Sequence, residues 1–190
     1  MQELGGLRNT QQEQQGIRGF SFVELMVVIA LIGILSAISL PSLLKGLPEK
    51  RLKAAARNVY ADLQKARLLA VKKNKKITVR FNESDRYYYF DEDKKGTAGY
   101  KEWNPDEIRG NLADYGDVIY GKGGAVKKWY NSVITNVASN HGIVFKPTGG
   151  AENDSVYLQY PGDDVCYAIT TTIYGAVKIR RFNGVSWDVD

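Results

Sequence analysis

The chain has 190 residues, of which 26 are Lys or Arg and 21 are Asp or Glu, so its formal net charge is +5. Hydrophobic residues make up 44% and charged residues 25% of the chain. This composition is ordinary for a globular protein and excludes a disordered tail protein, a collagen-like repeat and a polytopic membrane protein. A single Cys and a single His exclude an internal disulfide framework and a histidine-rich metal site. We expect neither a metal site nor a cofactor.

The chain begins with a polar segment, residues 1–19, which has no net charge, and continues with an apolar run at residues 20–40. As a helix with a rise of about 1.5 Å per residue, this run spans about 30 Å, which is the thickness of a bilayer's hydrocarbon core. It is longer than the apolar region of a secretory signal peptide, which has about 7 to 15 residues. The run predicts one transmembrane helix, and its length alone is compatible with an uncleaved signal anchor.

Glu24 is the only ionisable side chain in the apolar run, and it lies five residues after Gly19. A carboxylate inside a membrane helix costs about 2.5 to 3.5 kcal/mol, so it implies a partner. The Gly19-Phe20 junction, Glu24 and the long apolar helix together resemble the type IV pilins and type II secretion pseudopilins. The resemblance implies that a prepilin peptidase removes the leader, residues 1–19, and methylates the new N-terminus at Phe20.

Cleavage would create an α-amino group on Phe20, one helical turn before Glu24. In a bundle of such helices, the amine of one subunit can neutralise Glu24 of a neighbouring subunit, because neither charge is stable alone in hydrocarbon. We therefore predict that Phe20 and Glu24 direct assembly with other pilins or pseudopilins. The alternative is that Glu24 only reaches toward the polar surface of the membrane.

The upper part of the apolar run contains helix-loosening residues. Gly33 and Ala37 allow close approach of helices, and Pro41 lacks an amide donor. Pilins commonly carry a proline at this place, so Pro41 is a second point of resemblance. We expect hinge positions at Gly33 and Pro41, with residues 41–48 forming a bent or partly unwound segment.

Orientation in the membrane follows from the leader rather than from the charge count. Residues 41–76 carry eleven Lys or Arg against two acidic residues, and the positive-inside rule alone would place them in the cytoplasm. Long domains translocate regardless of their charge, and a prepilin leader must face the cytoplasm to be cut. The resemblance therefore implies a bacterial inner-membrane protein with one span and a periplasmic C-terminal domain, residues 49–190.

This C-terminal domain begins with an amphipathic helix over residues 49–73, in which apolar residues recur at spacings of three and four. Alternating strand patterns follow, so the order of elements predicts an α+β fold with the helix packed on an antiparallel sheet. Residues 91–131 form a polar, Gly-rich insertion between the second and third strands. The expected strands are residues 77–81, 86–90, 132–137, 142–146, 155–160, 165–173, 176–182 and 185–188.

The hairpin after the helix, the Gly-Ile-Val-Phe-Lys-Pro-Thr-Gly stretch at residues 142–149 and the terminal hairpin resemble the GspH/FimT group of minor pilins and pseudopilins. Major pilins often close a C-terminal loop with a disulfide, which the lone Cys166 cannot form within one chain. The resemblance thus favours a minor component of a type IV pilus or a type II secretion pseudopilus.

A DNA-binding minor pilin at a pilus tip, acting in natural transformation, is the alternative. Some FimT-like proteins grip DNA with a Gly-Arg-x-Arg pattern, which is broken here because Lys178 follows Gly175-Ala-Val. A two-residue turn at Asn183-Gly184 would place Arg180 opposite Trp187. That pair could stack on bases or form a cation–π contact beside the core. The candidate nucleic-acid patch comprises Lys178, Arg180, Arg181 and Trp187.

A third alternative is a signal-anchored periplasmic enzyme. Residues 116–122 match part of a phosphate-binding loop, but Gly123 stands where Ser or Thr should follow. His141 lies in a turn sequence, and Cys166 lies in an apolar run that predicts burial. We therefore expect no catalytic residues and no enzyme activity, and we expect the partners to be the prepilin peptidase, other pilins or pseudopilins and the inner membrane.

Overall fold

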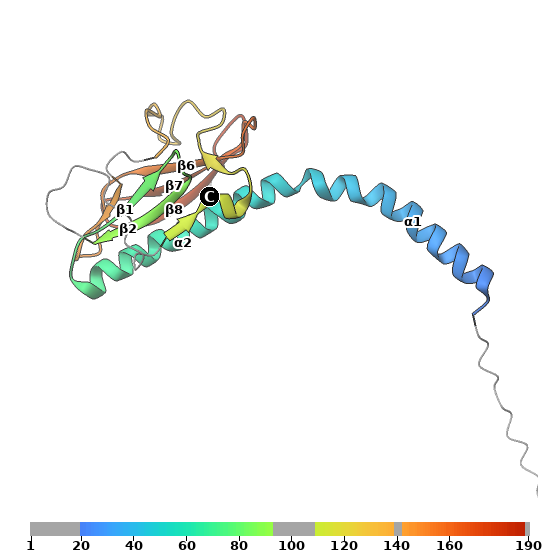
Figure 1. The fold of residues 1–190 in the computed structure, drawn as a ribbon. Coiled ribbons are helices and arrows are strands. Elements are labelled where there is room, and N and C mark those ends of the chain that lie inside the picture. Colours follow the sequence, from blue (N-terminus) through green and yellow to red (C-terminus); the bar gives the residue numbers. More distant parts are fainter. Residues whose placement is uncertain (1–19, 93–108, 139–141, 189–190) are drawn as a thin grey trace, which may run out of the picture. The chain divides into compact units, whose positions relative to one another are not determined.

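The structure is a computed structural model that describes residues 20–92, 109–138 and 142–188, and in residues 40–45 only the backbone. The leader, His141 and Val189 lie outside these ranges. The chain divides into two compact units, Met1–Leu44 and Lys45–Asp190. Figure 1 shows the elements in chain order.

The first unit contains helix α1, Phe22–Lys45, which is apolar along most of its length. Its aliphatic side chains are exposed on all sides, as Leu31 at 55% and Leu35 at 64% illustrate. The helical backbone continues through Gly33 and Pro41, and the break before the next helix lies at Gly46. Helix formation here satisfies the backbone hydrogen bonds within the segment, as a lipid environment requires.

The second unit begins with helix α2, Leu47–Lys73. Its end is set by Asn74, which adopts a left-handed conformation (φ 50°, ψ 40°) and donates its N–H to the Ala70 and Val71 carbonyls. The helix buries one stripe of side chains, as the periodicity predicts, and leaves its cationic side chains outside. The buried residues are Leu52, Ala55, Ala56, Val59, Leu63, Ala66 and Ala70.

Two four-stranded antiparallel sheets complete the domain, whereas the sequence predicted one. The first has the order β3-β2-β1-β5, and the second has the order β4-β6-β7-β8. The strands of the first sheet are β1 (Ile77–Asn82), β2 (Tyr87–Glu92), β3 (Arg109–Asn111) and β5 (Ile143–Phe145). Those of the second are β4 (Ile119–Tyr120), β6 (Ser155–Gln159), β7 (Cys166–Thr171) and β8 (Val177–Phe182), and a 3₁₀ turn, Leu112–Tyr115, follows β3.

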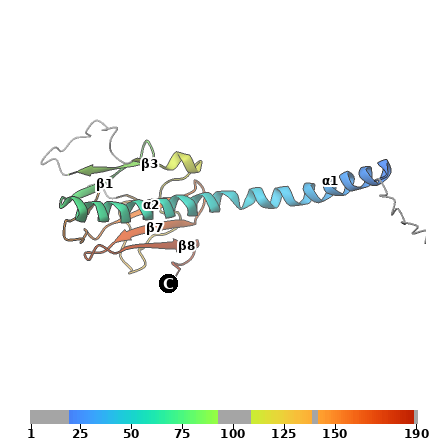
Figure 2. The ribbon, with the colours of Figure 1, turned by 90° about the horizontal axis from the view of Figure 1, so that it is seen from below.

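Helix α2 covers both sheets, as Figure 2 shows. Alternate residues of the second sheet take opposite faces: Ile169 joins the main core under α2, whereas Cys166 and Ala168 join a separate apolar cluster. Residues 121–138 cover this second cluster with Ala125, Ile134 and the partly buried Trp129. The second sheet therefore has α2 on one face and a long loop on the other.

Arg67 of α2 connects turns that belong to the two different sheets. Its Nε donates to the Gly149 carbonyl at 2.9 Å, beyond β5, and its Nη2 donates to the Tyr174 carbonyl at 3.4 Å, between β7 and β8. The two turns touch at Gly175, where φ is +75° and an added Cβ would lie 1.9 Å from the Gly149 oxygen. Only glycine fits there.

Three strand predictions are wrong. Residues 132–137 form no strand but only an isolated bridge between Lys127 and Val133, because the segment crosses over the second sheet instead of joining it. Residues 185–188 likewise form only a bridge, from Trp187 to Phe182. The predicted insertion contains strands β3 and β4.

Candidate assembly site

The N-terminal assembly residues lie at the start of α1. Phe20 is 80% exposed, and Glu24 lies in the first turn of the helix, where the Leu25 N–H donates to the Ser21 carbonyl at 3.1 Å. Acidic side chains suit a helix N-terminus. Gly19 precedes the described residues. In the full chain the Phe20 nitrogen is an amide, so the amine predicted to pair with Glu24 would exist only after cleavage at Gly19.

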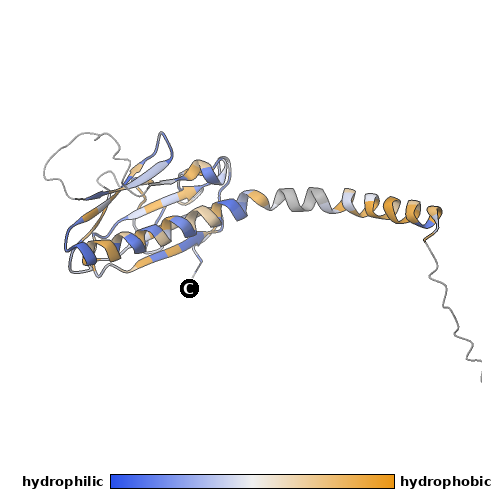
Figure 3. Ribbon diagram, turned by 60° about the horizontal axis from the view of Figure 1, so that its bottom comes forward, coloured by the Kyte–Doolittle hydropathy of each residue, from blue (hydrophilic) through white to orange (hydrophobic). Residues whose placement is uncertain are grey.

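Helix α1 contains one segment, Phe22–Ser39, that is long and apolar enough to cross a membrane. Glu24 is its only ionisable residue, and Figure 3 shows the contrast between this apolar segment and the mixed surface of α2. None of these side chains is buried within the first unit. The segment therefore presents an apolar surface on every side, with one carboxylate near its start.

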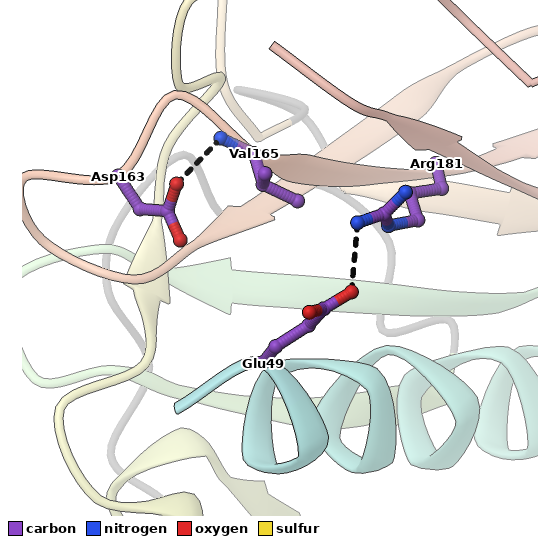
Figure 4. Close-up of polar contacts among 4 residues, drawn as sticks. All are labelled: Glu49, Asp163, Val165 and Arg181. Carbon is purple, nitrogen blue, oxygen red and sulfur yellow. Dashed lines mark hydrogen bonds and ion pairs between the residues drawn. The ribbon is translucent and has the colours of Figure 1, made fainter. Parts of the chain in front are cut away.

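The structure separates the four residues of the predicted nucleic-acid patch onto two faces of the second sheet. Arg181 lies on the α2 face, where its Nη2 donates to Glu49 Oε1 at 2.7 Å (Figure 4). Lys178 and Arg180 alternate with it and lie on the opposite face with Phe182. The patch is therefore not a single surface, because Arg181 serves an ion pair with the first turn of α2.

Arg180 does not stack on Trp187, which corrects the prediction. Its guanidinium lies over Trp129, 5.3 Å from the ring centroid, and its Nη1 donates to the Asp188 carbonyl at 3.2 Å. Trp187 instead pairs with Phe182, with ring centroids 5.3 Å apart. The turn is two residues longer than predicted because the Asn183 side-chain oxygen accepts the N–H groups of both Val185 and Ser186.

A cleft of about 700 Å³ opens beside these residues. Trp129 and Trp187 meet edge to face with centroids 6.3 Å apart, and the Trp187 indole N–H donates to the Lys127 carbonyl at 2.7 Å. The residues that line the cleft are Gly124, Val126, Lys127, Lys128, Trp129, Asn131, Arg180, Phe182, Val185, Ser186, Trp187 and Asp188.

Sequence reasoning missed Trp129 and its two neighbouring lysines as members of this cleft. They lie about 50 residues before β8 in the chain, inside the segment predicted to be an insertion, residues 91–131. The one available signal was the Lys-Lys-Trp-Tyr run at residues 127–130, which combines cations with aromatic rings.

Among the described residues, those considered as possible catalytic residues do not lie in surroundings suited to catalysis. Cys166 is fully buried, and burial raises the pKa of its thiol to about 12, so the thiolate is rare at neutral pH. Residues 116–122 contain strand β4 rather than a helix-capping loop. In the part of the chain described, no three His, Cys, Asp or Glu side chains cluster to hold a metal ion.

The polar contacts of α2 are structural. Tyr88 of β2 is buried and donates its hydroxyl to Asp62 Oδ2 at 2.5 Å, while Asn58 Nδ2 donates to the Tyr88 oxygen at 3.2 Å. Burial, followed by this hydrogen bond, raises the pKa of Tyr88 well above its usual value. The hydroxyl therefore stays neutral and fixes α2 on the first sheet.

Comparison with known protein families decides the identity of the domain. A family model described as type II transport protein GspH matches residues 55–175, which is more than half of the chain. The chain belongs to the GspH family. A second model, the prokaryotic N-terminal methylation motif, matches residues 15–40. Among curated proteins, no relative matches the chain.

Two solved structures are similar to this chain, both of the minor pseudopilin EpsH from the type 2 secretion system of Vibrio cholerae. Each is 14% identical and covers 68% of this chain, and the TM-score is 0.48 for both. The match covers 95% of one EpsH chain and 93% of the other.

Membership of the GspH family confirms the predicted type IV pilin-like superfamily and the GspH/FimT group. The α+β prediction is also confirmed, and the family match supports the prediction of a pilin- or pseudopilin-type assembly component. The family is structural rather than enzymatic and implies assembly with other pilins or pseudopilins. The apolar helix and the methylation motif fit a membrane-anchored, prepilin-like protein. These matches do not favour a DNA receptor or a signal-anchored enzyme.

Proposed function

We propose that this GspH-family chain is made as a prepilin, cut between Gly19 and Phe20 by a prepilin peptidase, methylated at Phe20 and added to a type II secretion pseudopilus. The single observation that carries this proposal is Glu24, the only ionisable residue of the unburied apolar span Phe22–Ser39, at the fifth position after Gly19. The GspH domain that follows supplies the family context.

Before assembly, α1 would span the inner membrane once, with the leader in the cytoplasm and residues 49–190 in the periplasm. The span Phe22–Ser39 has the length that a bilayer requires. The exposed aliphatic side chains of this span favour contact with lipid or with the helices of other subunits, because their exposure to water has a high free-energy cost.

During assembly, the Phe20 amine of one subunit would pair with Glu24 of a neighbour. Two opposite charges attract strongly where water is excluded, and either charge alone is costly there. The pair would therefore fix the axial register of neighbouring helices. Gly33 and Pro41, with residues 41–48, would let the helix adjust to its neighbours, and the described break at Gly46 falls in this interval.

The chain itself would contribute structure and no catalytic step. Its one thiol is buried and its pKa is about 12, so it is unsuited to act as a nucleophile at neutral pH. We propose no enzyme activity and no bound cofactor or metal.

Glu24→Leu tests the assembly step. We expect the variant to be inserted and cut normally, with Phe20 as its N-terminus by mass spectrometry, but its amount in sheared pseudopili to fall about tenfold or more. The matched control is Glu83→Leu, which removes an exposed carboxylate from the β1–β2 turn and should leave incorporation unchanged. Normal incorporation of Glu24→Leu, or assembled material that still begins at Met1, would contradict the proposal.

A further inference from the structure

The outer edge of β8 is only partly used. β8 is the last strand of the second sheet, and Figure 2 shows it as the outermost strand below α2. At one end of the strand, the Asp188 N–H donates to the Arg181 carbonyl at 2.8 Å, so the returning segment already pairs with this edge. Among the described residues, the pairing reaches no further along the strand than Arg181.

The remaining edge can accept another strand. N–H and C=O groups of alternate residues point to the same side of a strand, so Val177 and Ile179 present theirs on the same outer side as Arg181. An edge with unpaired backbone groups is a template for pairing with another chain. The returning segment already pairs in this way with the Arg181 carbonyl, at the neighbouring end of the strand.

The cleft lies next to this stretch, at the Arg180–Phe182 end of β8, and has the composition of a recognition site. Val126 and Val185, which line it, are exposed at 64% and 88%, and Trp129 and Trp187 supply aromatic surface. Exposed apolar groups beside Trp and Arg are typical of the centres of protein interfaces.

The charge of the cleft selects an acidic partner. Lys127, Lys128 and Arg180 line it against one carboxylate, Asp188. The Arg180 Nε is buried and has no hydrogen-bond partner among the described residues. Lys178 adds a cation on the same face of β8. Lys127 is exposed and Lys128 is partly exposed, so both can attract an incoming carboxylate.

We propose that this site docks an extended, acidic segment of another polypeptide chain, which adds a strand to the free edge of β8 and places an apolar side chain in the cleft. Backbone pairing would supply affinity, and alternate side chains would supply specificity: carboxylates toward the cations and one apolar residue toward the tryptophans. A nucleic acid or an oligosaccharide fits the cations or the rings, but neither can pair with the strand edge. This proposal is independent of the N-terminal assembly step.

The test uses the full chain in detergent micelles and a phage-displayed library of random dodecapeptides. Clones are selected on the unaltered protein and depleted on Val185→Asp. This side chain is 88% exposed, so we expect the change to leave the fold intact. We expect the selected peptides to carry carboxylates at alternate positions and one large apolar residue. The affinity of these peptides should fall about tenfold for Val185→Asp, which adds a negative charge to the cleft. It should fall by a similar factor for Lys127→Glu, which replaces a positive charge with a negative one. Leu68→Asp, the same kind of change at an exposed residue of α2, should have no effect.

Two further probes make the outcome decisive. Methylating alternate backbone nitrogens of a selected peptide should abolish binding, because it removes the donors of the added strand. Oligothymidylate and a mixture of oligosaccharides should not compete for the site. The proposal is overturned if no clone distinguishes the protein from Val185→Asp, if N-methylated peptides bind equally well, or if oligothymidylate displaces the peptides.

Discussion

Helices α1 and α2 follow one another in the chain, but they differ in the exposure of their apolar side chains. Leu63 of α2 is 0% exposed, whereas Leu31 of α1 is 55% exposed. The stripe of α2 faces two sheets of its own domain. The apolar residues of α1 extend around the helix, and none of those in the described span Phe22–Ser39 is buried.

The difference shows that the two helices depend on different surroundings. Burial of apolar surface contributes roughly 25 cal/mol per Å², and α2 obtains this contribution inside its own chain. α1 can obtain it only from lipid or from other subunits. The stability of the domain should therefore depend on α2 and be insensitive to the apolar residues of α1.

The largest effect should come from truncating a core leucine of α2. Leu63→Ala should lower the free energy of unfolding of the domain by about 2–5 kcal/mol, since it leaves a cavity between the helix and the sheets. Leu31→Ala, the same change in α1, should alter it by less than about 0.5 kcal/mol. Urea unfolding of the full chain in detergent measures both values. Equal losses would mean that α1 belongs to the folding unit.

A smaller effect should come from the polar side of α2. Tyr88→Phe removes the donor to Asp62 and should cost about 1–3 kcal/mol. Because the pKa of Tyr88 is raised in the folded state, the unfolded chain loses its proton first, so stability should be constant below about pH 10 and fall above it.

Above about pH 10, each tyrosine whose pKa is raised in the folded state should lower the free energy of unfolding by about 1.4 kcal/mol per pH unit. Tyr88→Phe should make the alkaline slope shallower, as measured by urea unfolding between pH 8 and 11. An unchanged slope would show that Tyr88 ionises as easily in the folded protein as in the unfolded chain.

The smallest effect should come from the ion pair at the start of α2. Glu49→Gln removes the charge that meets Arg181, but the Glu49 side chain is 56% exposed, so the loss should be at most about 1 kcal/mol. It should shrink further in high salt. Thermal unfolding at low and high ionic strength measures this, and a loss above 2 kcal/mol would mean that the pair is effectively shielded from water.

The local pattern of apolar and polar residues was sufficient to predict elements whose structure depends mainly on their own sequence. The spacing of apolar residues predicted the buried stripe of α2, whose seven buried residues recur at these spacings, while Leu69 beside them is partly buried. Alternation predicted the hairpin of β1 and β2 in the first sheet and the pairing of β7 with β8 in the second. The Glu24 motif was visible because a carboxylate in an apolar run is rare.

Elements that depend on distant partners were not predictable. Strand β3 exists because Gly110 leaves room for the Tyr88 ring, whose Cζ would lie 2.1 Å from an added Cβ. The loop after β8 is set by the side chain of Asn183, which shifts Trp187 opposite Phe182. The cleft needed both this shift and the position of Trp129, and neither follows from local periodicity.

The contacts of Arg67 have a mechanical consequence. Its guanidinium holds a turn from each sheet, at the Gly149 and Tyr174 carbonyls. A force applied along α2 is therefore transmitted to both sheets of the second unit, instead of separating one sheet from the helix. The second unit can therefore move as one rigid body when force is applied through α2.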